Sequence, residues 1–221
     1  MANETRIRKT RIKLPEAERL LIMSQNERPF WNRCIAVAGM DEVGRGPLAG
    51  PVVAACVMMP PNCLIDGVND SKKLSKKKLE LLHGLITEKA LAYGVAFVDE
   101  NVIDEINILQ ATKRAFKLSF EAMLDKGVSC GTVFVDAVKG LDIDAEQHPL
   151  IHGDALCYSI AAASIIAKVE RDRFMVEMAA KYPEYGFEMN VGYGTKQHID
   201  AIKQYGPCEI HRRSFIKNFV D

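Results

Sequence analysis

Residues 35–58 constrain the fold more than any other part of the sequence. They hold two apolar runs, 35–40 and 52–58, each only a few residues long and closed off by glycine, proline and charged residues. Runs of this length and boundary are typical of buried strands rather than helices. We therefore expect two strands that are joined by a tight, glycine-rich connection.

The connection between these strands carries charged residues of an unusual kind. Asp41 and Glu42 stand where the first strand is expected to end, and the turn Gly44-Arg45-Gly46 follows. Carboxylates beside a buried strand cost free energy unless a cation neutralises them. Glycines on both sides of Arg45 allow backbone conformations that other residues avoid, and let a ligand approach the peptide groups. The pattern favours a metal and ligand site; a polar turn with solvated acids is the simpler alternative.

The remainder of the main chain alternates between strand and helix patterns. Two further strands are expected at 91–99 and 132–138, and helices after Ser75 and at 106–124, 159–181 and 196–204, whereas 139–152 looks irregular. The helix 106–124 has a core-facing stripe at helical spacing, made by Leu109, Thr112, Phe116, Phe120 and Met123. Three strands before the first long helix imply one α/β sheet in which the first strands pair largely antiparallel and helices cover the sheet.

The first 33 residues differ in character from the rest of the sequence. Residues 1–13 are rich in lysine and arginine and suit either a mobile arm on a phosphate backbone or a solvated tail. Pro15 fits the start of a short amphipathic helix that reaches Met23. We therefore divide the chain into an N-terminal extension with a short helix, 1–33, and a main domain, 34–221.

Composition limits the class of protein. The chain is 48% hydrophobic and 26% charged, with 29 basic and 29 acidic residues, so a nucleic-acid partner would have to be held by local basic clusters. The densest such cluster is the five lysines within 70–78, which could equally be a solvated face. The six cysteines form no C-x-x-C pair, and no apolar run is long enough to span a bilayer. These features predict a reduced, cytoplasmic protein.

Four acids recur at the ends of predicted elements: Asp41, Glu42, Asp136 and Asp154. Carboxylates that converge at one sheet edge make a hard-oxygen site of the kind that suits Mg²⁺ or Mn²⁺. Two such ions about 4 Å apart stabilise the attacking and leaving oxygens of a phosphoryl displacement. The sequence has no H-E-x-x-H or Walker motif that would indicate another chemistry.

The motifs of the chain resemble those of ribonuclease HII. The resemblance begins near residue 35 and reaches the C-terminus. It rests on MDEVGRGPLAGP (40–51), NDSKKL (69–74), the strand that ends in Asp136, IAAASIIAKVERD (160–172), GYGTKQH (192–198) and HRRSF (211–215). Their number and order make the resemblance specific. One segment, 188–191, departs from the family, which often has a basic residue there.

The resemblance implies a ribonuclease H-like fold: a mixed central sheet flanked by helices, with a helical C-terminal part. It also implies a metal-dependent endoribonuclease that cleaves RNA in RNA–DNA hybrids and incises 5′ of ribonucleotides embedded in duplex DNA. The products would carry 3′-hydroxyl and 5′-phosphate ends. The expected partners are these nucleic acids, and a monomer without membrane attachment is expected.

The resemblance further assigns residues. Asp41, Glu42, Asp136 and Asp154 would be catalytic and bind Mn²⁺ or Mg²⁺, with two ions when substrate is bound. Substrate contacts would come from Gly44, Arg45 and Gly46 at the ribonucleotide sugar, Lys72 at a phosphate and Tyr193 at the adjacent sugar. The first three suit that task because only the 2′-hydroxyl separates RNA from DNA at a given site, and glycines expose backbone groups that can reach it. The histidines at 148, 152 and 198 receive no role.

Two other classes of protein remain open. A two-metal nuclease or strand-transfer enzyme on the same fold would cleave DNA that lacks ribonucleotides. A nucleic-acid-binding module with a structural cation would bind hybrids without turnover, although its acids would repel phosphate.

Overall fold

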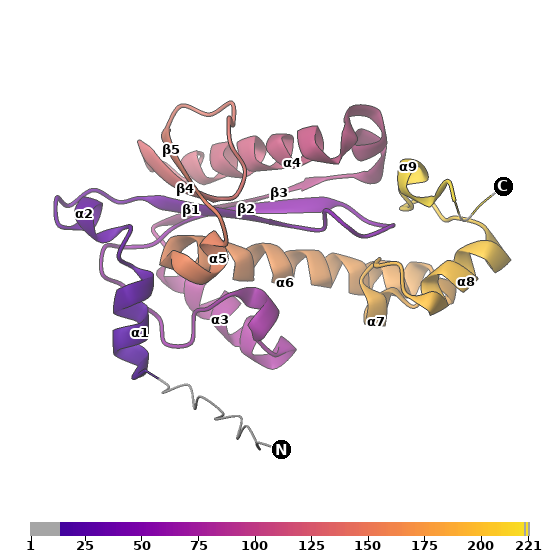
Figure 1. Ribbon diagram of the computed structural model, residues 1–221, viewed down its shortest axis with the longest axis horizontal. Helices are drawn as coiled ribbons and strands as arrows, with labels where there is room; N and C mark the ends of the chain where they lie inside the picture. Colours follow the sequence, from indigo (N-terminus) through magenta and orange to yellow (C-terminus); the bar gives the residue numbers. More distant parts are fainter. Residues whose placement is uncertain (1–13, 219, 221) are drawn as a thin grey trace, which may run out of the picture.

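A computed structural model describes residues 14–218 and 220, and its centre is one five-stranded sheet (Figure 1). The strands are β1 (Ala38–Val43), β2 (Val52–Met58), β3 (Ala92–Val98), β4 (Thr132–Asp136) and β5 (Glu146–Leu150), in the order β3-β2-β1-β4-β5. The first three pair antiparallel, whereas β4 runs parallel to β1 and β5 runs parallel to β4. The expected mixed sheet with an antiparallel opening is confirmed.

Helices cover both faces of this sheet (Figure 1). The long helix α4 (Glu100–Leu124) packs on one face, where Phe116 and Phe120 are buried against the strands. The opposite face is covered by α6 (Tyr158–Lys181), with α3 (Lys76–Lys89) packed on α6. The sheet therefore separates two hydrophobic cores, one on the α4 side and one on the α6 side.

The helix α6 approaches β1 unusually closely. A Cβ atom placed on Gly39 would lie 2.0 Å from the carbonyl carbon of Ser159, so only glycine fits at this point of the strand. The alanines 161–163 on the helix are fully buried, as expected for a helix that lies close to a sheet. This contact fixes the start of α6 against the beginning of β1, two residues before Asp41.

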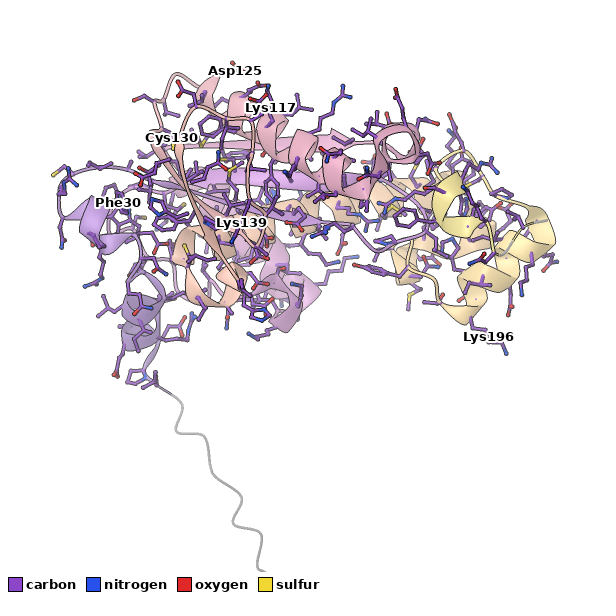
Figure 2. The ribbon with its side chains drawn as sticks, turned by 45° about the horizontal axis from the view of Figure 1, so that its top comes forward. Phe30, Lys117, Asp125, Cys130, Lys139 and Lys196 are labelled. Carbon is purple, nitrogen blue, oxygen red and sulfur yellow. The ribbon has the colours of Figure 1, made fainter. Side chains whose placement is uncertain are left out.

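Short helices form both ends of the described chain. At the C-terminal end lie a 3₁₀ turn, η2 (Pro183–Tyr185), and the helices α7 (Phe187–Asn190), α8 (Lys196–Tyr205) and α9 (Arg213–Ile216). Figure 2 shows Lys196 of α8 and Phe30 of α2 (Arg28–Trp31) at opposite ends of the molecule. Among the described residues, no helix has the length and apolar character needed to cross a membrane.

The described part of the N-terminal extension packs into the α6-side core. Its helix α1 (Glu16–Met23) buries Leu20 and Met23, and Trp31 of α2 is buried beside them. The fully buried Glu27 accepts a hydrogen bond of 2.8 Å from the N–H of Ser159 at the start of α6. The division of the chain at residue 33 stays a prediction, and the expected basic arm, 1–13, lies outside the described residues.

Three expectations about elements are wrong. The strand β1 continues through Asp41 and Glu42 to Val43, because its pairing with β2 extends to Val53. Part of the segment expected to be irregular forms β5, an edge strand without apolar alternation that contains a proline, as edge strands tolerate. The helix α4 begins at Glu100 and is kinked at Asn107, and Leu109, expected in the core-facing stripe, is 44% exposed.

Candidate active site

Asp41 and Asp136 meet because their strands are parallel neighbours. The paired residues of β1 and β4 end at Met40 and Val135, so the two aspartates are the next residue on each strand. Both side chains lie on the face of the sheet covered by α6. Phe134 of β4 contributes to the hydrophobic core on that face, and Asp136, two residues later, points the same way because side chains alternate along a strand; Asp41 is the corresponding residue of β1. The parallel register thus brings two carboxylates together at one end of the sheet.

Asp154 reaches the same place from a short helix, α5 (Gly153–Leu156), that follows β5. The N–H of Gly153 donates a hydrogen bond of 2.7 Å to Oδ1 of Asp136, which ties the start of α5 to the end of β4. A Cβ atom on Gly153 would lie 2.5 Å from Cδ1 of Ile160 in α6, so a larger residue would have to displace the tip of that buried side chain.

Glu42 approaches the site from the other face of the sheet. Alternation along β1 places the side chain of Glu42 on the α4 side of the sheet, opposite that of Asp41. The side chain of Glu42 is only 10% exposed. Its Oε1 atom accepts from Arg45 at 3.2 Å, and within the described residues its buried Oε2 atom has no hydrogen-bond partner. The four acids therefore surround the end of β1 rather than lying on one surface.

The electrostatics of this end of the sheet favour a cation. Burial raises the pKa of Asp41 well above its usual value, and the charges of Glu42, Asp136 and Asp154 raise it further. Burial is also the main cause that raises the pKa of Asp136 and of Glu42. Negative charge is thus concentrated here without enough positive charge to balance it.

The donor set fits a divalent metal ion. All donors are carboxylate oxygens, the set that Mg²⁺ and Mn²⁺ prefer, and the unpartnered Oε2 of Glu42 is a free ligand. In the arrangement of the described chain, no three acidic, histidine or cysteine side chains yet stand close enough to hold a metal. Donors of the chain itself contact three of these carboxylates: Arg45 contacts Glu42, Gly153 contacts Asp136 and Lys72 contacts Asp154.

Lys72 is one of these donors. It lies in the turn η1 (Ser71–Lys73), whose start is fixed by Asp70, which accepts from the N–H of Lys72 at 3.0 Å. Its Nζ atom pairs with Oδ2 of Asp154 at 3.0 Å, while the lysine side chain stays 78% exposed. The basic loop and the acids therefore share one surface, although the phosphate contact of Lys72 stays a prediction.

The glycine turn and Tyr193 are neighbours. Gly44 has a φ of 92°, a conformation that favours glycine, and a Cβ atom there would lie 2.6 Å from the carbonyl oxygen of Pro51. A Cβ atom on Gly46 would lie 3.8 Å from the Tyr193 ring, which is an ordinary contact distance. Tyr193 is 45% exposed, so its ring and the turn form one accessible surface.

Comparison with known proteins decides the family. The family model described as "Ribonuclease HII" matches residues 38–218. The chain belongs to the ribonuclease HII family. It is 53% identical over 207 residues to ribonuclease HII of Ruminiclostridium cellulolyticum, which covers 93% of this chain and 80% of the relative. It is 52% identical over 206 residues to ribonuclease HII of Acetivibrio thermocellus, covering 93% and 79%.

A solved relative agrees with this assignment. The crystal structure of ribonuclease H2 from Pyrococcus horikoshii superposes with a TM-score of 0.71 and 28% identity, covering 84% of this chain and 97% of that chain. The expected ribonuclease H-like fold is confirmed, as is the expectation of a metal-dependent endoribonuclease. As a member of the ribonuclease HII family, the chain has ribonuclease H activity on RNA–DNA hybrids.

Sequence reasoning missed two groups of buried polar residues in this ribonuclease HII chain. Arg171 and Arg212 are fully buried and donate to backbone carbonyls of the connection between β1 and β2. His198 and His211 are buried with their Nε2 atoms 3.0 Å apart, and Nδ1 of His198 lies 2.9 Å from the carbonyl oxygen of Tyr193. Both groups fall in motifs of the family, but an arginine or histidine in a polar stretch gives no sign that it is buried.

Proposed function

We propose that this chain incises duplex DNA on the 5′ side of an embedded ribonucleotide, in addition to cleaving RNA in hybrids, and leaves 3′-hydroxyl and 5′-phosphate ends. One observation carries the proposal. The acids at the ends of β1 and β4 adjoin the Gly44–Gly46 turn, so a cleavage site and a site for reading a sugar stand side by side. We place this activity in a cytoplasmic monomer.

The acids would form the metal site. Asp41, Glu42, Asp136 and Asp154 would hold Mg²⁺ or Mn²⁺, with two ions when substrate is bound. Ions bound there would supply positive charge for the displacement at phosphorus, which four carboxylates cannot supply alone. The raised pKa values of Asp41 and Glu42 support this assignment, because they indicate that the site is short of positive charge before a metal binds.

Neighbouring residues of the chain would place the substrate. Lys72 would bind a phosphate next to the acids, since its exposed ammonium already lies 3.0 Å from Asp154 and has only to turn outward. Such a contact carries no base or sugar information, so recognition should tolerate any sequence. Removing Lys72 from Asp154 would also free an oxygen of that carboxylate for a metal.

Sugar recognition would belong to the glycine turn and Tyr193. The acids act on any phosphodiester, so the choice of ribose needs another group. The backbone N–H groups of the turn are accessible because Arg45 and Gly46 are exposed, and a hydroxyl could pair with them. The Tyr193 ring beside Gly46 would offer a flat surface to the adjacent deoxyribose. A site built to pair with a hydroxyl penalises its absence strongly.

Incision of a labelled DNA duplex that contains one ribonucleotide tests the proposal. We expect one cut on the 5′ side of the ribonucleotide, a 3′-hydroxyl that a polymerase extends, and no cut when EDTA removes the metal. A 2′,3′-cyclic phosphate would instead mean that the neighbouring 2′-hydroxyl attacks phosphorus. Equal cutting of the same duplex without the ribonucleotide would favour a general two-metal nuclease.

Variants of the acids test their role separately. Asp41→Asn and Asp136→Asn should each lose nearly all turnover and still bind hybrids, because they remove a metal ligand and also lessen repulsion of phosphate. Turnover within a few-fold of the unaltered chain at saturating Mg²⁺ would show that the changed residue is not a ligand.

A further inference from the structure

The guanidinium of Arg212 is buried against the backbone of the glycine turn. Its Nη2 atom donates to the carbonyl of Gly44 at 2.6 Å, and its Nη1 atom donates to the carbonyl of Arg45 at 3.1 Å. Nε and Nη2 both donate to the carbonyl of Gly50, at 2.9 and 2.7 Å. Four of the five N–H donors of this side chain are thus used on three main-chain oxygens of one loop.

Arg171 serves the same loop from the other side. It extends from α6 and donates to the carbonyls of Ala49 and Pro51 at 3.2 and 3.0 Å, and to that of Val191 at 2.9 Å. Its third partner belongs to the segment that leads to Tyr193. Arg171 therefore joins the far part of the loop to the C-terminal segment, while Arg212 alone holds the carbonyls of the glycine turn.

Neither arginine forms an ion pair within the described part of the chain, although both side chains are fully buried. Burial lowers the pKa of Arg171 to about 10, and burial together with the charge of Arg171 lowers that of Arg212 to about 9. Two like charges are costly to bury without a carboxylate between them. Backbone carbonyls are their main compensation, so the two arginines and the loop depend on each other.

Peptide geometry links Arg212 to sugar reading. In a trans peptide the C=O and the N–H point in opposite directions. Because Arg212 holds the carbonyls of Gly44 and Arg45 inward, the next N–H groups, those of Arg45 and Gly46, point away from it toward the exposed side of the turn. No hydrogen bond inside the described part of the chain uses either N–H group.

We propose that Arg212 is a positioning residue for sugar selectivity: by fixing two carbonyls it aims the N–H groups of Arg45 and Gly46 at the 2′-hydroxyl of the bound ribonucleotide. The inference rests on the proposed function of the glycine turn and adds the group that orients it. Arg212 does not touch the sugar, and its effect passes through the backbone of the turn.

Binding selectivity in a non-cleaving protein gives the test. In an Asp41→Asn background with EDTA, affinity is measured for a DNA duplex with one ribonucleotide and for the same duplex without it. Arg212→Lys keeps the charge but has one nitrogen, which cannot span the carbonyls of residues 44, 45 and 50. We expect the ratio of the two affinities to fall roughly tenfold, as for the loss of one correctly oriented hydrogen bond to the 2′-hydroxyl.

Arg171→Lys is the matched control. It removes a guanidinium of the same burial, with a similar number of carbonyl partners, but none of these partners is in the glycine turn. It should lower the thermal midpoint about as much as Arg212→Lys but lower the affinity ratio clearly less, because Arg171 packs beside Gly44 and holds Val191 near Tyr193 but binds neither carbonyl that orients the turn. If both variants lower the ratio equally, Arg212 acts only through general stability and the inference is overturned.

Two further measurements keep the result decisive. If Arg212→Lys does not fold, Phe215→Leu takes its place in the test. This variant removes a ring 5.2 Å from the Arg212 guanidinium without removing a hydrogen bond, and it should also lower the ratio of the two affinities. The backbone amide resonances of Arg45 and Gly46 should move in Arg212→Lys much more than in Arg171→Lys. Unmoved resonances would overturn the inference whatever the affinities are.

The failure of the proposed function has a different signature. If the parent protein binds both duplexes equally, the glycine turn does not read the sugar, and the amide resonances alone then decide whether Arg212 orients the turn. If the parent prefers the ribonucleotide and Gly46→Ala removes that preference while Arg212→Lys keeps it, the proposed function stands and the role of Arg212 is refuted.

Discussion

Asp41 combines a central place in the site with a cost to folding. It is 5% exposed, and three other carboxylates lie near it. Its pKa is raised in the folded chain, so between the usual value of 3.8 and the raised value the folded state binds more protons than the unfolded state. Stability from this residue is therefore lost as the pH rises through that range, and at neutral pH the charge of Asp41 destabilises the fold.

This cost predicts a stabilised variant. Without metal at pH 7, Asp41→Asn should raise the thermal midpoint by at least about 2 °C, because about 1 kcal/mol moves the midpoint of a chain of this size by about 2–4 °C. The asparagine keeps Oδ1, which accepts from the N–H of Glu42 at 2.8 Å. Calorimetry at several pH values checks this, and the gain should vanish near pH 4 and below.

Asp154→Asn is the comparison variant for this effect. It also removes a carboxylate from the site, but that carboxylate already pairs with Lys72 at 3.0 Å. We expect no comparable rise in its midpoint. A midpoint of Asp41→Asn equal to or below that of the unaltered chain would show that another group compensates the buried charge.

At the scale of single residues, the sequence indicated the acids better than the groups that support them. Carboxylates at the ends of apolar runs stand out, and glycines around Arg45 stand out as well. Arg171 and Arg212 do not, because their partners are main-chain carbonyls that every residue has. Only the folded arrangement shows which arginine is buried and what it holds.

The close contact between β1 and α6 should be the most sensitive junction between two elements. Gly39→Ala places a Cβ atom 2.0 Å from the backbone of Ser159, and neither backbone can move without disturbing the sheet or the helix. We expect a loss of about 1–3 kcal/mol or more in the free energy of unfolding, as for overpacked cores. Denaturant titration followed by circular dichroism measures it.

Gly84→Ala is the matched control for that substitution. Gly84 lies in α3 with nothing within 4 Å of a Cβ atom, and alanine is favoured over glycine inside a helix. The free energy of unfolding of Gly84→Ala should rise by about 0.5–1 kcal/mol. A similar loss in both variants would mean that the contact between β1 and α6 adjusts, and that Gly39 does not set its distance.

At the scale of elements, apolar periodicity predicted the helices and strands that bury an apolar face, and missed the strand residues that bury none. The strands β2 and β3 and the helix α6 have clear apolar patterns and were predicted within one residue, whereas the expected start of α4 lay six residues too late. The edge strand β5 has none, since its residues are half-exposed and pairing with β4 alone makes it a strand. The extent of β1 could not be seen either, because only pairing with β2 keeps charged residues in a strand.

For the whole molecule, charge is balanced in number but not in space. The chain carries 29 basic and 29 acidic residues, yet negative charge gathers at the end of β1 and a lysine-rich loop borders it. Nucleic acid must therefore be held by a few local phosphate contacts. Lys72→Ala should weaken binding and reduce the slope of log affinity against log salt by roughly one unit, as expected for one contact.

Lys89→Ala serves as the control for this measurement. Lys89 is exposed at the far end of α3, about 20 Å along the helix from its start near Lys72. Its removal should change neither affinity nor slope to the same extent. If Lys72→Ala leaves the slope unchanged, Lys72 serves Asp154 alone and touches no phosphate.

The anchoring of the loop between β1 and β2 through its main chain has a consequence for variation and engineering. A carbonyl is present whatever side chain a residue carries, so the arginine contacts at 45 and 49 place no demand of their own on residue type. The surface side chain of residue 45 could therefore be exchanged in a library without unfastening the loop. Such exchanges would alter the ion pair between Arg45 and Glu42, at 3.2 Å, and leave the fastening of the loop in place.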